Sequence, residues 1–395
     1  MIDDVKPVNG PSESLEVEPG ESDDTNSLNS PNDNVETLDM NKLEHEPSTE
    51  DTPPAPPKNN WKDKLRAHWP PSRKEWVFIV IVILLAAGLA YFLIRPAAHK
   101  SDMPLKPKAV KQATAISNLV PSTLTGLPVD PSVNQRTVTG VMIENSLPAR
   151  PQSGLGQAGV VFEALTEGGI SRFLALYQDT APSNIGPIRS ARPYFIQWAL
   201  GFDAAYAHVG GSPQALADIS AWDVHDMNEF YNGAYYHRSG SRAAPHNMYT
   251  SIAQLNKLEA AKGFTSTFTG FPRKSESPAK QAAAGNINFN ISWSSYAVHY
   301  DYVKASNSYN RSEGGTPHVD ANTNTQISPK VVIAMVVPYS VGSLDATGAS
   351  YSDYAAVGSG PVYVFQDGTV TTGQWAKTSA QSQITFTSGS GQTIK

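Results

Sequence analysis

The sequence predicts an α+β protein. A mixed sheet with the element order β-α-β-α-β-α forms an N-terminal lobe, and a β-rich, mostly antiparallel C-terminal lobe follows it. Two observations predict this class. Short apolar runs alternate with helical patterns up to residue 262, and helical patterns are missing after residue 286. No self-similar period of about 20 to 50 residues is present, which excludes a repeat architecture.

The elements of the N-terminal lobe are predicted from their periodicity and their ends. Glycine follows both early helices, as expected for a helix C-terminus. The last helix begins at a capping box, Ser251 to Gln254, and Gly263 follows it. In chain order we expect strand 138–144, helix 157–167, strand 171–178, helix 192–200, strand 203–209, helix 213–219 and helix 252–262.

The C-terminal lobe is predicted from short β-type runs separated by Gly-rich turns. A polar, Pro-containing stretch at 271–285 marks the boundary between the lobes. The Asp-Gly turn at 366–369 is typical of a hairpin. The predicted strands are 288–293, 296–304, 330–337, 361–365 and 384–387.

The part of the chain before the lobes predicts a membrane-tethered protein. Residues 1–60 carry fifteen acidic residues and three lysines, a net charge of −12, and this composition is typical of a disordered tail. A basic juxtamembrane segment, 61–75, precedes 19 uncharged residues at 76–94. As a helix this run spans about 28 Å, enough for a bilayer core. We interpret it as a signal-anchor transmembrane helix rather than a cleaved signal peptide.

Three further segments complete the predicted domain order. Residues 95–120 form a linker, 121–282 the N-terminal α/β lobe and 283–395 the C-terminal β-rich lobe. Five basic residues before the helix and four after it leave the orientation undecided by charge. We expect a single-pass protein of the cell membrane with a cytoplasmic N-terminus and an extracytoplasmic C-terminal domain, because a late signal-anchor leaves its leading tail inside.

Composition excludes several classes of site. The chain has no cysteine, so disulfides, Cys-ligated metals and Cys nucleophiles are excluded. Its net charge is −6, so residues 61–395 carry +6, which is too weakly basic to indicate nucleic-acid binding. The histidines lack metal-ligand spacing, and the dinucleotide and Walker motifs are missing. We therefore predict no metal site and no cofactor.

The best candidate for a binding site lies in residues 186–216. If the predicted strands are parallel, their carboxyl ends share one sheet edge, where ligands gather. Gly210, Gly211 and Ser212 then begin a helix, whose free N–H groups attract anions. Arginines can add bidentate contacts to carboxylate or phosphate. The candidate ligand-binding residues are Glu144, Asn145, Arg189, Arg192, His208, Gly210, Gly211, Ser212, His246 and Asn247.

Simpler interpretations of the same residues stay open. The glycines and Ser212 also fit an ordinary capped helix, and the arginines fit surface ion pairs. Ser212 does not lie in a G-x-S-x-G motif, so it is not predicted to be a nucleophile. Glu163 and Glu167 are four residues apart on the predicted helix and could form an acid–base pair, although a solvated helix face is the commoner role of such carboxylates. Glu167 precedes Gly168 and Gly169, a turn that could place it at the opposite edge of the sheet, and the same question stays open for Arg172, which begins the next predicted strand.

Several sequence blocks resemble the YerB-like lipoprotein family, a bacterial group of unknown function. The blocks are VMIENSLPARPQSGL, VVFEALTEGGISRFLALY, IGPIRSARPYF and DAAYAHVGGSPQAL, followed by APHNMYTS and YNRSEGGTPHVD. The resemblance implies an extracytoplasmic, tethered protein with two family regions, over residues 121–395. It implies no reaction and no catalytic residue. Here a transmembrane helix takes the place of the lipidated cysteine. The family pattern usually continues with one more strand beyond GQTIK, so the chain is expected to be incomplete at its end.

Three functions agree with these observations. The first is a module of the bacterial cell envelope that binds an anionic or glycan ligand at the candidate residues. The second is a cell-envelope hydrolase with Glu144 or His208 as general base. The third is a trans-membrane scaffold that links partners through its tail and its outer domain. The sequence does not decide between an enzyme and a binding module, and it leaves the oligomeric state open.

Overall fold

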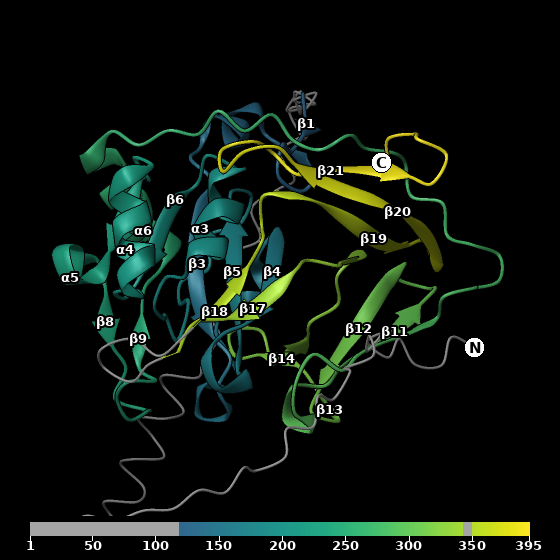
Figure 1. Cartoon of the computed structure of the whole chain (residues 1–395). Coiled ribbons are helices and arrows are strands. Elements are labelled where there is room, and N and C mark those ends of the chain that lie inside the picture. The colour runs from purple at the N-terminus through teal and green to yellow at the C-terminus, as the bar shows by residue number, and fades with distance from the viewer. Residues whose placement is uncertain (1–117, 343–349) are drawn as a thin grey trace, which may run out of the picture. The chain divides into compact units, whose positions relative to one another are not determined.

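The structure is a computed structural model that describes residues 118–342 and 350–395. All of these residues belong to one compact unit (Figure 1). The predicted tail, basic segment and transmembrane helix, and most of the predicted linker, lie outside the described residues. Within the described ranges, no helix is long and apolar enough to cross a bilayer.

A five-stranded mixed sheet forms the centre of the N-terminal lobe, with the strand order β4-β5-β3-β6-β7. Strand β6 is parallel to β3 and β7, whereas β5 is antiparallel to β3 and β4. The ends of β3, β4, β6 and β7 and the start of β5 therefore meet along one side, which we call the carboxyl edge. The strands are β3 (Thr139–Glu144), β4 (Val160–Leu165), β5 (Ser171–Tyr177), β6 (Ala205–His208) and β7 (Asp226–Asn228).

The predicted helix at 157–167 is wrong, because this segment is strand β4. It pairs antiparallel with β5, with Val160 opposite Leu176 and Leu165 opposite Ser171. Its core, VVFEAL, is rich in residues that favour strands. Gly168 has a positive φ of 65°, so it serves the turn of this hairpin and not a helix end. The lobe thus has the order β-β-β-α-β-α-β.

The other predicted helices form close to their predicted bounds. In α6 the Ser251 side chain accepts a hydrogen bond from the Gln254 backbone N–H, as the capping box predicts. The helices are α3 (Pro193–Leu200), α4 (Pro213–Ala221), α5 (Glu229–Asn232) and α6 (Ile252–Lys262). Short 3₁₀ turns lie at Pro131–Gln135, Leu147–Ala149, Leu155–Gln157, Glu167–Gly169, Gly233–Tyr235 and Ser294–Tyr296. Two small ladders pair β1 (Val120–Pro121) with β2 (Pro128–Val129) and β8 (His237–Arg238) with β9 (Met248–Tyr249).

The C-terminal lobe is antiparallel, which confirms the prediction for this part. Asp367 and Gly368 both have positive φ at the predicted hairpin turn. One sheet contains β10 (Asn286–Phe289), β11 (Val298–Val303), β12 (Ser308–Glu313) and β13 (Thr316–Pro317). A second contains β16 (Val331–Met335), β19 (Gly358–Gln366), β20 (Thr369–Lys377) and β21 (Thr385–Ser388). Hairpins pair β14 (Val319–Asp320) with β15 (Thr325–Gln326) and β17 (Tyr339–Val341) with β18 (Ser352–Tyr354).

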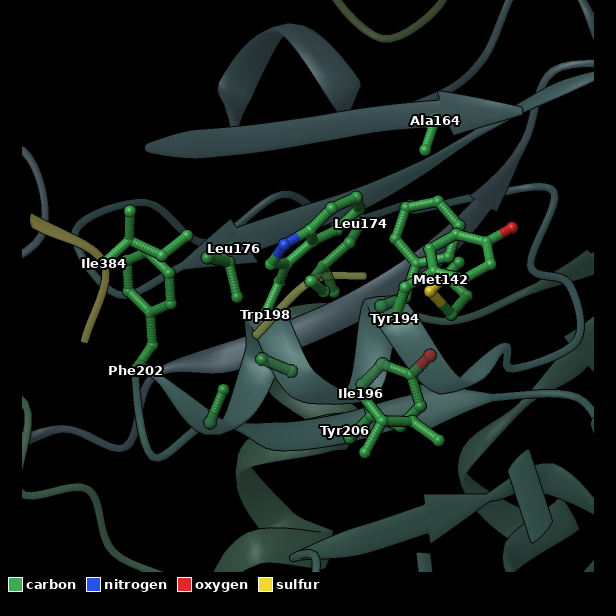
Figure 2. Close-up of a cluster of buried hydrophobic side chains, with 14 of the residues drawn as sticks. Met142, Ala164, Leu174, Leu176, Tyr194, Ile196, Trp198, Phe202, Tyr206 and Ile384 are labelled. Atoms are coloured by element: carbon green, nitrogen blue, oxygen red, sulfur yellow. The ribbon is translucent and has the colours of Figure 1, made fainter. Parts of the chain in front are cut away.

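Two apolar cores cover the two faces of the central sheet. On one face, Met142 and Leu174 pack with Trp198 of α3 (Figure 2). Trp375 of β20 and Ile384, from the C-terminal lobe, belong to the same core. On the other face the core contains side chains of α6. The two lobes therefore share one hydrophobic core, and the sheet is held rigidly behind its carboxyl edge.

Candidate functional site

The carboxyl edge gathers most of the predicted site residues, although by a different route from the one predicted. Strand β5 runs antiparallel to β3, so its end does not reach this edge. The chain after β5 returns instead, and Ile188 forms an antiparallel bridge with Ile143. The Arg189 N–H donates to Met142 O at 3.0 Å. This return brings Arg189 beside the end of β3.

Glu144 is the centre of the first charged cluster. Its side chain is 4% exposed, and Oε2 lies 3.2 Å from Arg189 Nε. Its Oε1 lies 2.8 Å from His246 Nδ1 and accepts a hydrogen bond of 2.6 Å from the Ser146 hydroxyl. One buried carboxylate thus positions an arginine and a histidine that remain 27% and 23% exposed.

Two groups in this cluster are free to contact a ligand. Among the described residues, the Nη1 and Nη2 atoms of Arg189 and the Nε2 atom of His246 have no hydrogen-bond or ion-pair partner. Glu144 Oε2 is buried without a hydrogen bond, because the Arg189 contact is ionic and poorly aligned. Unmet hydrogen-bonding capacity beside a buried carboxylate is costly and is typical of functional sites.

A second charged cluster forms at the β4–β5 turn. Glu167 accepts two 2.6 Å hydrogen bonds from the Arg192 guanidinium, and Arg172 lies 4.0 Å from the same carboxylate. Burial raises the pKa of Glu167, but the hydrogen bond and charge of Arg192 lower it to a net value below its usual range. Burial and the like charge of Arg192 lower the pKa of Arg172 to about 10, so it is still cationic at neutral pH. Because β4 ends and β5 begins at the carboxyl edge, Glu167 and Arg172 lie at this edge and not at the opposite one, a question that the sequence leaves open.

The Gly210–Ser212 turn lies beside the arginine segment, but its polar groups are largely used within the protein. Ser212 Oγ accepts from the Ala215 N–H, which closes the start of α4. The Gly210 N–H donates to Asn228, and its carbonyl accepts from the Ala191 N–H. Gly211 pairs with Ala191 in a parallel bridge. The turn therefore acts here as a support that fixes the arginine segment against β6.

Three further predicted residues have internal partners. His208 is fully buried, with Nδ1 2.7 Å from Gly210 O and Nε2 2.9 Å from Asp226 Oδ1. Asn247 accepts from Arg238 and donates to Ser239 O. Asn145 donates to Ser171 Oγ and Glu313 Oε1. These residues hold the edge together rather than face solvent.

Sequence reasoning missed a polar network between the lobes, next to the edge. Arg311 of β12 lies 3.0 Å from Glu163 Oε2 of β4 and 3.5 Å from Glu313 Oε2. It also donates to His318 Nδ1 at 2.9 Å. Burial, Arg311 and Arg150 lower the pKa of His318 to about 2, so His318 is neutral. Burial and then Glu163 raise the pKa of Glu313. The contacts of Arg311 with Glu163 in β4, and of Glu313 with Asn145 just after β3, arise only in the tertiary fold, so no local pattern signals them.

A shallow cavity of about 310 Å³ opens at this junction. It is lined by Arg150, Pro151, Glu313, Thr316, Pro317, His318 and Val319. Arg150 is already occupied, because it donates to Asn145, Ser295 O and Glu313. The described residues contain no group of three acidic or histidine side chains that could hold a metal ion.

The two clusters and the network together have a surplus of positive charge. Four glutamates are in ion-pair contact with five arginines; the residues are Glu144, Glu163, Glu167 and Glu313 with Arg150, Arg172, Arg189, Arg192 and Arg311. The raised pKa of Glu313 increases this surplus when that carboxyl is protonated. A site of this composition favours an anion over a cation.

Comparison with known proteins gives one consistent group. The chain matches the models described as "Protein of unknown function (DUF3048) N-terminal domain", over residues 124–265, and "Protein of unknown function (DUF3048) C-terminal domain", over 287–395. It is 30% identical over 308 residues to "Putative lipoprotein YerB" of Bacillus subtilis (strain 168). The aligned region covers 76% of this chain and 87% of that protein. The crystal structure of YerB from Bacillus subtilis is similar with a TM-score of 0.60 and 29% identity, over 70% of this chain and 92% of that chain.

Proposed function

Because the chain belongs to the YerB-like family and carries both of its domains, we propose that it is a membrane-anchored extracytoplasmic module that binds an anionic or glycan ligand of the cell envelope. The lipoprotein name of its relative supports an extracytoplasmic, membrane-associated location. The anchor of this chain is proposed to be the apolar segment 76–94.

The observation that carries this proposal is the pair of partly exposed side chains, Arg189 and His246, that contact Glu144. Arg189 offers two guanidinium nitrogens and His246 one ring nitrogen, and the same buried carboxylate fixes both. Groups held in place before binding lose little entropy on binding. An arginine in this position suits the bidentate geometry of a carboxylate or phosphate. The surplus of arginine at the carboxyl edge favours the same ligands.

The test measures binding of acidic envelope fragments to the purified full-length chain by isothermal titration calorimetry. The probes are a disaccharide of N-acetylglucosamine and N-acetylmuramic acid, which carries a carboxylate, and a short phosphate-bearing teichoic acid fragment. Arg189→Gln is expected to weaken binding about tenfold or more, as loss of a charge-assisted pair does. Arg136→Gln, just before the opposite end of β3, is the matched control and is expected to bind like wild type.

Equal affinities of Arg189→Gln and wild type for both probes would refute the proposed site.

A second function, hydrolysis of an envelope polymer, is favoured by one feature only. His246 directs Nδ1 to Glu144 and leaves Nε2 free, as a general base requires. Shortening of the saccharide during the titration, monitored by mass spectrometry, would indicate that function instead of binding alone.

A further inference from the structure

Exposed aromatic side chains lie at the two ends of the carboxyl edge. At the β4 end, Trp293 is 67% exposed beside the β4–β5 turn, where Ser292 Oγ donates to Gly169 O at 2.6 Å. A Cβ built on Gly169 would lie 3.6 Å from Trp293 Nε1, so ring and turn are neighbours. At the β7 end, Phe230 is 68% exposed and packs against Gly210.

The space between these aromatic residues contains the charged groups of the site. From β4 to β7 the edge carries the Glu167–Arg192 pair, then Glu144 with Arg189 and His246, then the Gly210 turn. The five strands lie about 4.8 Å apart, so the carboxyl edge is about 19 Å long from β4 to β7. Tyr231, which is 82% exposed, follows Phe230 in α5.

We infer that the ligand is a linear acidic glycan that lies along the carboxyl edge, with sugar rings stacked on Trp293 at one end and on Phe230 at the other. This inference rests on the proposed function and specifies its ligand. The Arg189–His246 pair contacts an acidic group near the middle of the glycan. Arg192 and Glu167 form the polar wall next to Trp293.

The arrangement suits a glycan better than a lipid surface or a peptide. A lipid surface needs a contiguous apolar patch, whereas here the aromatic rings are separated by ion pairs. A pyranose ring has an apolar C–H face, which fits a flat aromatic ring, and hydroxyls at its rim, which fit arginine and carboxylate side chains. A peptide bound by strand addition needs a free strand at the side of a sheet, but the carboxyl edge presents strand ends.

The experiment compares saccharides of two lengths on the full-length chain by isothermal titration calorimetry. The probes are the disaccharide and the hexasaccharide of alternating N-acetylglucosamine and N-acetylmuramic acid, with stem peptides removed. Wild type is expected to bind the hexasaccharide more tightly. Trp293→Ala and Phe230→Ala are each expected to weaken hexasaccharide binding about tenfold and to leave disaccharide binding unchanged. Tyr363→Ala, an exposed tyrosine on β19 of the second sheet, is the matched control.

The outcomes separate the inference from the function beneath it. If both aromatic variants bind the hexasaccharide like wild type, or if wild type binds the two saccharides equally tightly, the inference is wrong. If the teichoic acid fragment binds through Arg189 and neither saccharide binds, the proposed anion-binding site is retained and the inference that the ligand is a linear acidic glycan is wrong. If Arg189→Gln changes no affinity, the proposed function fails first. All three substituted residues of the aromatic test are exposed, so folding is expected to be retained, and circular dichroism verifies it.

Discussion

At the scale of single residues, Glu259 in α6 shows how burial changes the behaviour of a carboxyl. It is 5% exposed and accepts a 2.6 Å hydrogen bond from the Thr139 hydroxyl. Burial raises its pKa to about 7, and the bond from Thr139 offsets this only in part. The folded-state pKa of Glu259 lies above its unfolded-state value. The stabilising contribution of the protonated carboxyl to the free energy of unfolding is therefore complete below about pH 4.5 and is lost as the pH rises through 7.

Glu259→Gln removes this titration and keeps an acceptor for Thr139. We expect the variant to gain about 1 to 3 kcal/mol in free energy of unfolding relative to wild type between pH 4 and pH 8, because only wild type must ionise a buried group. Urea unfolding at the two pH values measures the difference. A stability gap between the two proteins that is the same at pH 4 and pH 8 would show that Glu259 titrates normally.

The histidine and arginine on Glu144 show the limit of residue-scale reasoning. Glu144, Arg189 and His246 are all predicted from the sequence as candidate site residues, but the contact between Glu144 and His246 spans 102 residues. The sequence places each near a strand or loop end, and only the fold shows that they share one carboxylate. Gly210 and Ser212 show the converse, because their local pattern is correct while their N–H and hydroxyl groups have partners inside the chain.

At the scale of elements, the predictions succeeded where local signals act alone. Helix α6 forms over the predicted residues because a capping box and a glycine set both ends. Strands β3, β5 and β6 follow their apolar runs. Segment 157–167 failed because its apolar residues fit a helical period equally well, and its pairing with β5 decides the conformation. That error made β5 parallel in the prediction, although it is antiparallel.

The returning segment at 185–191 depends on one glycine. Gly186 has φ of 150°, and a Cβ there would lie 2.7 Å from the backbone oxygen of Met248. Gly186→Ala is expected to destabilise the protein by about 2 to 4 kcal/mol, because the clash is with backbone. It is also expected to weaken binding at Arg189, since this segment carries that side chain.

Gly168→Ala is the matched control for this variant. Gly168 also has a positive φ, 65°, but a Cβ there meets open space. Gly168→Ala is expected to lower the free energy of unfolding by about 1 kcal/mol, which is the ordinary penalty for an alanine in the left-handed conformation. Urea unfolding compares the two variants, and equal losses of stability would mean that the contact with Met248 relaxes freely.

At the scale of the whole molecule, the network around Arg311 connects the lobes. Arg311→Met removes the cation from between Glu163 and Glu313 and leaves the buried Glu313 carboxylate close to the partly buried carboxylate of Glu163. We expect Arg311→Met to lower the free energy of unfolding by about 3 to 5 kcal/mol at pH 8, as happens when one partner of a buried ion pair is removed. The loss is expected to shrink toward pH 4, because protonation of the raised-pKa carboxyl of Glu313 removes the repulsion.

Lys330→Met provides the comparison for an exposed pair. Lys330 and Glu276 form an ion pair at 3.0 Å, but both side chains are more than half exposed. Pairs of this kind contribute about 0.5 kcal/mol or less. Chemical denaturation at pH 8 and pH 4 tests both variants together. If Arg311→Met and Lys330→Met have equally small effects, the two lobes are not held by the buried network.

The hydrophobic core that joins α3 to β20 also limits how the genes that encode proteins with these two lobes can be rearranged. Trp198 and Trp375 belong to one core although 177 residues separate them in the chain. A gene fragment that encoded either half alone would produce a chain with an uncovered apolar face, prone to aggregation and rapid proteolysis. The two halves should therefore be inherited as a unit, and domain shuffling should not have separated them. A survey of bacterial genomes is expected to find the two regions adjacent and in this order, with solitary copies confined to damaged genes.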